Sequence, residues 1–418
     1  MRSDQSNTGG IDLRIVSRLT FVLLLAIVQC NFQQKSKEDS YPPFVFEQGS
    51  SALDIPFRIV DDLIVISAKL NDSIIVDLFL DTGFGNDGIL LFNPEIGKKL
   101  NLNYVTQMPL GGGGDEETKI ANVAQGVSLS LEGIKFNNLQ TLVVTEKEDF
   151  EDLPVDGIIG RTLFNCILEI DYDKGHINLY DPNLEISKDL GTEFNLSFTY
   201  GVPVVEGEVL IDKESIPVKL IVDTGAGLPF FLFTYSNTKI RIPGNCISAK
   251  NEGLSGIMSY KLGRVKYFKI GEFVFDNPLT AFLEENSMGT ASVLGQNGFV
   301  GHQTLQKFSV VFDYSGNKMF LKPNNQYLRE FEFNMAGLVL KTRPDGKIIV
   351  FDVVENSPAW QENIKPGDLI TAIKDEDVSR LSFTEIYKLF SQEGEKTKLT
   401  LQRKSKQFDC LLTLKRII

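Results

Sequence analysis

The sequence predicts a mainly β protein that consists of two similar lobes followed by a small α+β domain. Three observations support this fold class. One pattern of strand-like segments occurs twice, the two copies cover about residues 50–325, and the pattern changes from about Phe331. A chain of 418 residues is also too long for one small core, so we expect two to three domains.

Composition narrows the classes of function. A net charge of −13 and a pI near 4.9 argue against a nucleic-acid partner, which requires a basic patch for its phosphates. There are only two histidines, His176 and His302, and four cysteines without Cys-x-x-Cys spacing, so neither a histidine-dependent nucleophile nor a zinc site is indicated. We therefore expect no metal and no cofactor, and any hydrolysis has to depend on carboxylates.

The N-terminal segment has the pattern of an export signal. Arg14 and Arg18 precede an apolar run, 19–28, that is short for a membrane span, and Cys30 follows it. This arrangement resembles a bacterial lipoprotein signal in which Cys30 becomes the lipidated residue, although Gln29 departs from the small residue of that pattern. An ordinary cleaved signal and an uncleaved anchor are the alternatives. We expect export to the bacterial cell envelope and a lipid anchor that holds the protein to the membrane.

The first half of the repeat predicts a hairpin in each copy. Segments 73–83 and 215–225 alternate between apolar and polar residues, and both end in Asp-Thr-Gly, 142 residues apart. Each follows another β-like run, Phe57–Leu70 in the first copy and Val202–Ile211 in the second, across a short turn-forming connector. The two copies therefore begin alike.

The second half of the repeat keeps the same spacing. Gly157–Gly160 matches Gly298–Gly301, and Asp171 and Asp313 each lie 90 residues after the aspartate of the triplet. The predicted organisation is an export segment at 1–30, a polar linker at 31–50, lobes at 51–185 and 186–325 joined through 181–198, and a further domain at 331–418.

The repeated triplet has a chemical use. The glycine permits a tight turn directly after the acid, and the threonine hydroxyl can both donate and accept hydrogen bonds. Two such loops facing each other would bring two carboxylates together, and these would share one proton because both cannot ionise at contact distance. One carboxylate could then take a proton from water while the neutral one polarises a peptide carbonyl.

The two triplets, each with a later apolar-apolar-Gly element, resemble the retropepsin and pepsin-type aspartic peptidases over about two thirds of the chain. The resemblance implies an acid-protease β-barrel fold of two lobes, a water nucleophile, no cofactor, and a monomer that carries both aspartates. It implies catalytic roles for Asp81 and Asp223. It assigns support of the active-site loops to Thr82, Gly83, Thr224 and Gly225.

Two further features bear on this resemblance. Ala226 fits the small residue that follows the triplet in the family, whereas Phe84 departs from it, and a ring there would narrow the site or change its water. In the family a glycine-bearing hairpin, the flap, closes over the substrate. Gly111–Gly114 and Gly253–Gly256 lie at similar distances after their aspartates and are predicted to be flaps, with plain flexible loops as the alternative.

The C-terminal domain resembles a PDZ domain. Ser357–Trp360 is predicted to cap a short helix, Pro366–Asp368 leads into a strand, and Phe383–Phe390 has helical spacing. The predicted peptide-binding loop is Gly337, Leu338, Val339 and Leu340, in which Val339 departs from the second glycine of the family pattern. PDZ domains add a peptide, here a C-terminus, as an extra strand beside the second helix. A domain that only braces the lobes is the alternative.

Together these features predict an aspartic endopeptidase that acts on peptide or protein substrates, with the chemistry in residues 1–325. Two alternatives remain. One is a non-catalytic peptide-binding envelope protein that retains a degenerate peptidase cleft, and the other is a structural envelope lipoprotein. The presence of both Asp-Thr-Gly triplets favours the enzyme.

Overall fold

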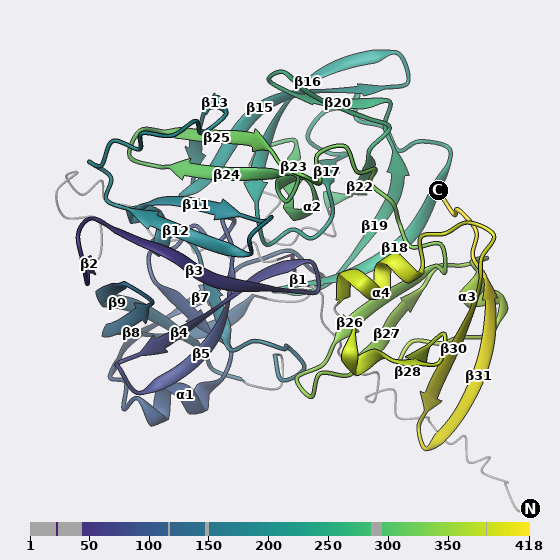
Figure 1. Ribbon diagram of the computed structural model, residues 1–418, viewed down its shortest axis with the longest axis horizontal. Coiled ribbons are helices and arrows are strands. Elements are labelled where there is room, and N and C mark those ends of the chain that lie inside the picture. The colour runs from purple at the N-terminus through teal and green to yellow at the C-terminus, as the bar shows by residue number, and fades with distance from the viewer. Residues whose placement is uncertain (1–21, 24–43, 116–117, 147–149, 286–294, 382) are drawn as a thin grey trace, which may run out of the picture.

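A computed structural model describes residues 22–23, 44–115, 118–146, 150–285, 295–381 and 383–418. It contains two β-rich lobes and a separate C-terminal domain, which packs beside both lobes (Figure 1). The predicted fold class, mainly β with a small α+β domain at the C-terminus, is confirmed. Most of the predicted export segment, including Cys30, lies outside the described residues.

Lobe 1 is formed mainly by antiparallel strands. Its elements are β2 (Phe44–Phe46), β3 (Ser51–Val60), β4 (Leu63–Leu70), β5 (Ile74–Leu80), β6 (Ile89–Leu91), α1 (Pro94–Lys99), β7 (Tyr104–Leu110), β8 (Lys119–Leu131), β9 (Ile134–Val144), β10 (Gly157–Ile159), the 3-10 helix η1 (Arg161–Asn165), β11 (Ile167–Asp171) and β12 (His176–Tyr180).

One prediction in this lobe is wrong. The run Phe57–Leu70 is not a single strand, because a two-residue turn at Asp61 and Asp62 separates β3 from β4. Both turn residues have positive φ, 50° and 60°, a conformation that aspartate tolerates better than most residues. The apolar runs on either side, Ile59–Val60 and Leu63–Ile66, hid this turn.

Lobe 2 repeats the plan of lobe 1. Its elements are β13 (Thr192–Asn195), β14 (Ser197–Thr199), β15 (Val202–Ile211), β16 (Glu214–Asp223), β17 (Phe230–Phe233), β18 (Cys246–Gly253), β19 (Gly256–Arg264), β20 (Tyr267–Ile270), β21 (Phe273–Asp276), β22 (Leu279–Leu283), β23 (Gly298–Gly301), α2 (His302–Leu305), β24 (Phe308–Asp313) and β25 (Lys318–Pro323). A two-residue strand, β1 (Val22–Leu23), pairs with β18. The predicted linker 181–198 contributes β13, which pairs with β25.

The same strand arrangement surrounds both triplets. In lobe 1, β10 runs parallel to β5, with Ile159 opposite Leu80. In lobe 2, β23 runs parallel to β16, with Val300 opposite Val222. Each apolar-Gly segment therefore lies directly beside the strand that leads into its aspartate.

The two lobes share one sheet and one core. The strand order β13-β25-β24-β11-β12-β3 carries hydrogen bonds from lobe 2 into lobe 1, through the pairing of β11 with β24. The largest buried hydrophobic cluster contains residues from both lobes, so apolar burial stabilises them as one unit. A smaller buried cluster in lobe 1 includes Phe79, Phe84 and Ile158 and is called here the lobe-1 cluster.

The C-terminal domain has its own buried core. Its elements are β26 (Leu338–Thr342), β27 (Ile348–Val353), α3 (Pro358–Gln361), β28 (Leu369–Ile373), β29 (Glu376–Asp377), the 3-10 helix η4 (Val378–Arg380), α4 (Phe383–Leu389), β30 (Lys396–Arg403) and β31 (Lys406–Thr413). The sheet order is β26-β27-β28-β30-β31, so β26 lies at one edge. Ser357 caps α3 by accepting a hydrogen bond from the Trp360 N–H, as predicted.

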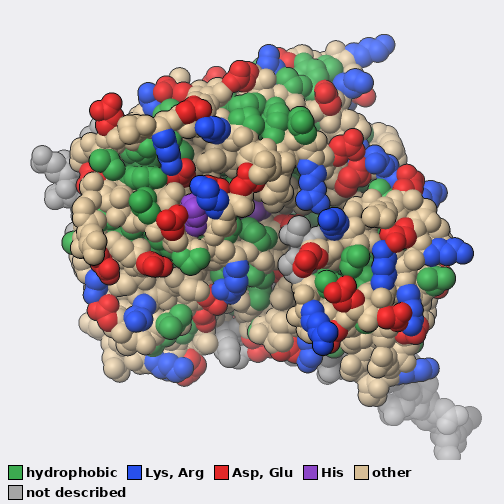
Figure 2. Space-filling model, viewed as in Figure 1, with side chains coloured by type: hydrophobic (Ala, Val, Ile, Leu, Met, Phe, Trp, Pro, Cys, Tyr) green, Lys and Arg blue, Asp and Glu red, His purple; other side chains and the backbone are tan. Residues whose placement is uncertain are grey.

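The surface and the helices add two observations. Figure 2 shows Lys and Arg side chains scattered among Asp and Glu side chains over the visible face. Among the residues that the structure describes, no helix combines the length and the apolar character needed to cross a membrane.

Candidate active site

The structure brings the two triplets together at the centre of the lobes. Asp81 follows β5 directly and Asp223 is the last residue of β16. The Asp81 N–H donates to the Ile159 carbonyl at 2.9 Å, which fixes the start of the loop against the apolar-Gly segment. Both aspartates are completely buried.

The threonines of the triplets interlock the loops. The Thr82 N–H donates to Thr224 Oγ1 at 3.0 Å, and the Thr224 N–H donates to Thr82 Oγ1 at 2.9 Å. Each hydroxyl then donates across the lobe boundary, Thr82 to the Val222 carbonyl at 2.6 Å and Thr224 to the Leu80 carbonyl at 2.7 Å. Four buried hydrogen bonds therefore hold the two loops in one relative position.

The glycines of the triplets allow the carboxyl groups to approach. A Cβ atom on Gly83 would lie 2.9 Å from Asp223 Oδ2, and one on Gly225 would lie 2.7 Å from the Asp81 carboxyl carbon. Any side chain would thus push the opposing aspartate away. The Gly83 N–H donates to Asp81 Oδ1 at 2.7 Å, and the Gly225 N–H donates to Asp223 Oδ1 at 2.8 Å. One oxygen of each carboxyl group is thereby fixed.

The other two oxygens, Oδ2 of Asp81 and Oδ2 of Asp223, are buried and receive no hydrogen bond from an ordinary donor. A hydrogen bond between the two carboxyl groups satisfies them, but only when one group carries a proton. Burial raises the pKa of Asp223 to about 7. Burial also raises the pKa of Asp81, and the neighbouring charge of Asp223 raises it further. The pair is therefore arranged to hold one proton.

Phe84 does not stand over the carboxyl pair as a free ring. It is completely buried and belongs to the lobe-1 cluster. Its N–H donates to Asp81 Oδ1 at 3.2 Å, so its backbone helps to hold the carboxyl group. The prediction that this ring narrows the site is therefore wrong.

The two predicted flap segments meet at their tips. Gly111–Gly114 belongs to the connection between β7 and β8, and Gly253–Gly256 forms the turn between β18 and β19. The Ser255 N–H donates to the Gly113 carbonyl at 3.0 Å. Leu254 reaches from lobe 2 into the lobe-1 cluster and is buried there. The hairpins of the two lobes therefore contact each other directly.

A buried tyrosine near the aspartates escaped the sequence reasoning. Tyr314 is buried, and burial is the main cause that raises its pKa, with a smaller contribution from the nearby aspartates. Its ring stacks on Phe164 at 4.3 Å. Its repeat equivalent, Tyr172, lies edge-on to His302 at 5.3 Å. The repeated Asp-Tyr dipeptide was the available signal, because each tyrosine follows a matched aspartate.

His302 lies in an apolar place. Its ring is completely buried, neither ring nitrogen has a hydrogen-bond partner, and burial lowers its pKa to about 3. An imidazole in this state stays neutral at ordinary pH and has no acceptor for its proton. This environment fits a structural role for His302.

The predicted peptide-binding loop, Gly337–Leu340, is buried and already bonded within the domain. The N–H groups of Gly337 and Leu338 both donate to Asn334 Oδ1 at 3.0 Å. The side-chain amide of Asn334 in turn donates to the Leu338 carbonyl. Asn334 therefore occupies the amides that the sequence pattern assigns to a peptide carboxylate.

The metal and thiol chemistry is limited. Within the described ranges, no group of three or more His, Cys, Asp or Glu side chains is placed to hold a metal ion. The thiols of Cys166, Cys246 and Cys410 are unpaired.

Comparison with known proteins gives one family match and several structural likenesses. Among solved structures, the chain is similar to a photosystem II D1 C-terminal processing protease, with 19% identity over 20% of this chain and 23% of that chain, and a TM-score of 0.19. It is also similar to an aspartic proteinase from Irpex lacteus, with 13% identity over 67% of this chain and 98% of that chain, and a TM-score of 0.41. The chain thus covers less than a quarter of the first of these proteins. A PDZ domain family model matches residues 328–414. The C-terminal part of this chain is a PDZ domain.

Proposed function

We propose that the chain is an aspartic endopeptidase in which Asp81 and Asp223 act as a dyad that shares one proton. One observation carries the proposal. Two buried carboxyl oxygens face each other without any other donor, on loops that four hydrogen bonds lock together. A purely structural pair of buried acids would be expected to have donors on all its oxygens.

In the proposed reaction, a water molecule between the carboxyl groups is the nucleophile. The ionised aspartate accepts a proton from this water while the protonated aspartate donates its proton to the carbonyl oxygen of the scissile bond. A carbon–oxygen bond forms and gives a tetrahedral diol. The diol then collapses. One diol hydroxyl gives its proton to the ionised aspartate as the carbonyl re-forms, the protonated aspartate donates its proton to the leaving amine, and the carbon–nitrogen bond breaks, so the dyad again holds one proton. The glycine N–H groups hold the outer oxygens during these transfers.

Peptide-library cleavage by the wild-type chain and by Asp81→Asn, Asp223→Asn and the double variant tests this function. Each single variant should lose cleavage, and the double variant should lose little more, because the two acids act as a unit. Cleavage that survives Asp223→Asn would refute the dyad. Peptide binding by a wild-type chain that cleaves nothing would instead support the non-catalytic alternative.

Substrate docking and location belong to the same proposal. The PDZ domain implies peptide binding, and we assign it the docking of a protein substrate or partner through an extended or C-terminal segment. We place the protein in the bacterial cell envelope, exported and lipid-anchored through Cys30. Cys30→Ser should release the protein from the membrane fraction. Continued sedimentation of that variant with membranes would contradict the lipid anchor and indicate that the apolar segment holds the chain.

A further inference from the structure

The edge strand of the PDZ domain offers backbone donors to a ligand. Strand β26 has one sheet neighbour, β27. The Arg343 N–H donates to the Lys347 carbonyl across this hairpin. Because successive residues of a strand point their N–H groups to opposite sides, the Thr342 N–H points away from β27. This open edge is the one to which a PDZ domain adds a peptide.

A carboxylate from lobe 1 already occupies that edge. The Thr342 N–H donates to Asp61 Oδ1 at 3.1 Å and to Oδ2 at 3.2 Å, and the Thr342 hydroxyl donates to Oδ1 at 2.6 Å. Asp61 is in the turn between β3 and β4 and is only 4% exposed. The peptidase part of the chain thus presents an acid to the PDZ edge as a bound peptide would.

The surroundings of Asp61 are charged and enclosed. Lys341 is almost completely buried, with its amine 3.6 Å from the centre of the Phe351 ring, and its positive charge favours the ionised form of Asp61. Asp62 is the nearby negative charge, and it accepts a hydrogen bond from Gln303 at 3.3 Å. Burial is the larger effect and raises the pKa of Asp61 to about 7. The hydrogen bonds from Thr342 therefore hold one carboxyl group in an enclosed place.

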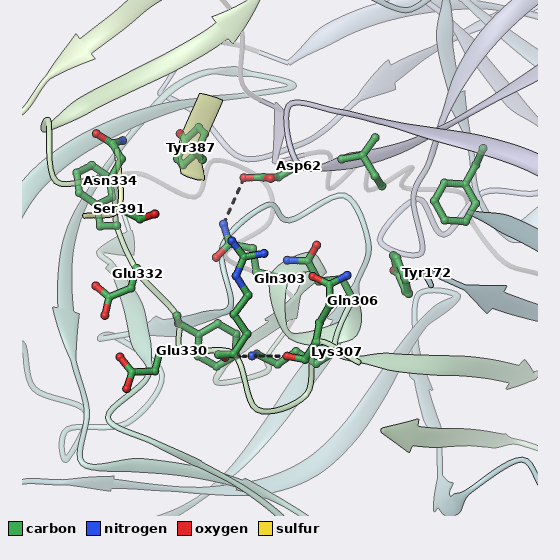
Figure 3. A pocket seen from close by; sticks show the side chains of 16 residues that line it. Asp62, Tyr172, Gln303, Gln306, Lys307, Glu330, Glu332, Asn334, Tyr387 and Ser391 are labelled. Carbon is green, nitrogen blue, oxygen red and sulfur yellow. Dashed lines mark hydrogen bonds between the residues drawn. The ribbon is translucent and has the colours of Figure 1, made fainter. Parts of the chain in front are cut away.

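Space remains beside this contact for more of a bound segment. A cavity of about 350 Å³ lies between the lobes, the PDZ domain and residues 324–337, which connect β25 to β26 and are called the linker from here on (Figure 3). Asp62 borders it from the turn, Gln303 from α2, Glu332 from the linker, and Tyr387 and Ser391 from in or beside α4. If the Asp61–Asp62 turn moved away, the volume that it fills would be added to this cavity.

The same PDZ hairpin holds the flap hairpin of lobe 2. The Lys341 amine lies 3.6 Å from the Glu252 carboxylate, and Glu252 directly precedes the flap turn at Gly253. Asp352 in β27 accepts a hydrogen bond from the Lys250 N–H, and β18 packs against β27. The residues that bind Asp61 and the residues that brace the flap are therefore neighbours on one hairpin.

We propose that the Asp61–Asp62 turn is a built-in ligand of the PDZ edge strand, and that an extended peptide with a carboxylate opposite Thr342 displaces it and frees the hairpin β18–β19. The flap role of this hairpin rests on the proposed function. Three parts of the proposal do not rest on it. These are the contact of Asp61 with Thr342, the competition between Asp61 and a peptide, and the coupling of that contact to the hairpin β18–β19.

Hydrogen exchange in the full-length chain tests the coupling without any need for cleavage. Asp61→Ala should speed amide exchange in β26 by about tenfold or more, because the Thr342 donors lose their acceptor. It should also speed exchange at residues 250–260, although Asp61 belongs to the other lobe. Asp61→Asn is the matched control. It keeps an oxygen that can accept from Thr342, so exchange in both regions should stay within about twofold of the wild type.

Each outcome of that experiment is informative. Faster exchange in β26 with an unchanged flap would overturn the coupling. Unchanged exchange in β26 would overturn the role of Asp61. Exchange in β30 and β31, at the far side of the PDZ sheet, should stay constant in all variants, and faster exchange there would mean that Asp61→Ala unfolds the domain and that the contact is not a local latch.

A peptide probe tests the competition. A labelled copy of residues 58–65 should bind full-length Asp61→Ala about tenfold or more tightly than the wild type, whose own turn competes for the edge. A copy with alanine in place of Asp61 should bind more weakly because it loses the acceptor of the Thr342 N–H and hydroxyl. Equal binding to both chains would overturn the built-in ligand, and no binding to either would overturn the acid-binding edge.

Discussion

At the scale of single residues, three of the buried carboxyl groups serve two different purposes. Asp81 and Asp223 leave one oxygen each for the other, whereas Asp61 receives its hydrogen bonds from the backbone and hydroxyl of Thr342. The roles proposed for Asp81 and Asp223 could be predicted because each residue belongs to an Asp-Thr-Gly triplet, and this local motif occurs twice. The third could not be, because its partner lies 281 residues further along the chain.

The raised pKa of the dyad predicts a pH-dependent cost in stability. The folded pKa of Asp223, about 7, lies above its ordinary value of 3.8, so the group contributes its full stability only below the ordinary value. That contribution is lost as the pH rises through about 7. Asp223→Asn should therefore melt above the wild type at about pH 8, by on the order of a few degrees, with a much smaller difference near about pH 4.

Thermal melts of both chains at the two pH values measure this effect. Exposed acids titrate in both chains alike and cancel in the difference. A wild type that gains stability relative to Asp223→Asn on going to higher pH would show that the folded state favours the charged pair.

At the scale of elements, close contact between backbones decides where glycine is required. The strands follow period-two patterns and could be predicted, but the meeting of the two flap tips depends on how the lobes face each other. Gly253 illustrates the point. A Cβ atom there would overlap the Gly113 carbonyl oxygen of the opposite hairpin, whereas one on Gly244 would meet nothing within 4 Å.

This contrast predicts a matched pair of variants. Gly253→Val should prevent the hairpin tips from closing together and lower kcat/KM for a peptide by about tenfold or more, because a closed flap positions substrate. Gly244→Ala should change little. The measurement is steady-state cleavage, with circular dichroism to confirm that both variants fold. Equal activity of the two variants would show that contact between the hairpin tips is not needed for cleavage.

At the scale of the whole molecule, the PDZ domain and the segment that links it to lobe 2 are packed against the two lobes. The Lys307 amine donates to the carbonyls of Gln326, Tyr327 and Arg329 in the linker. Phe331 and the last residue, Ile418, both join the large core of the lobes. The sequence pattern located the PDZ domain by its own motifs, but these contacts arise only from tertiary packing and carry no local signal.

Two truncations test this packing. A chain that ends after Phe333 keeps the linker on lobe 2, and one that ends after Asn324 leaves the buried Lys307 amine without its acceptors. The shorter chain should melt several degrees lower, on the order of the loss expected for unpaired buried polar groups. Short-peptide cleavage should survive in the longer chain, in line with a chemical apparatus confined to the lobes. Loss of that cleavage in a folded Phe333 truncation would make the PDZ domain part of the active site.

The shared sheet has a consequence for biosynthesis. Strand β11 of lobe 1 pairs with β24 of lobe 2, and β24 begins only at Phe308. While the chain is being made, the first half therefore carries an unpaired strand edge until most of the second half has emerged, and such edges readily pair with foreign chains. A chain with this topology is expected to need holding factors until β24 has emerged and paired with β11.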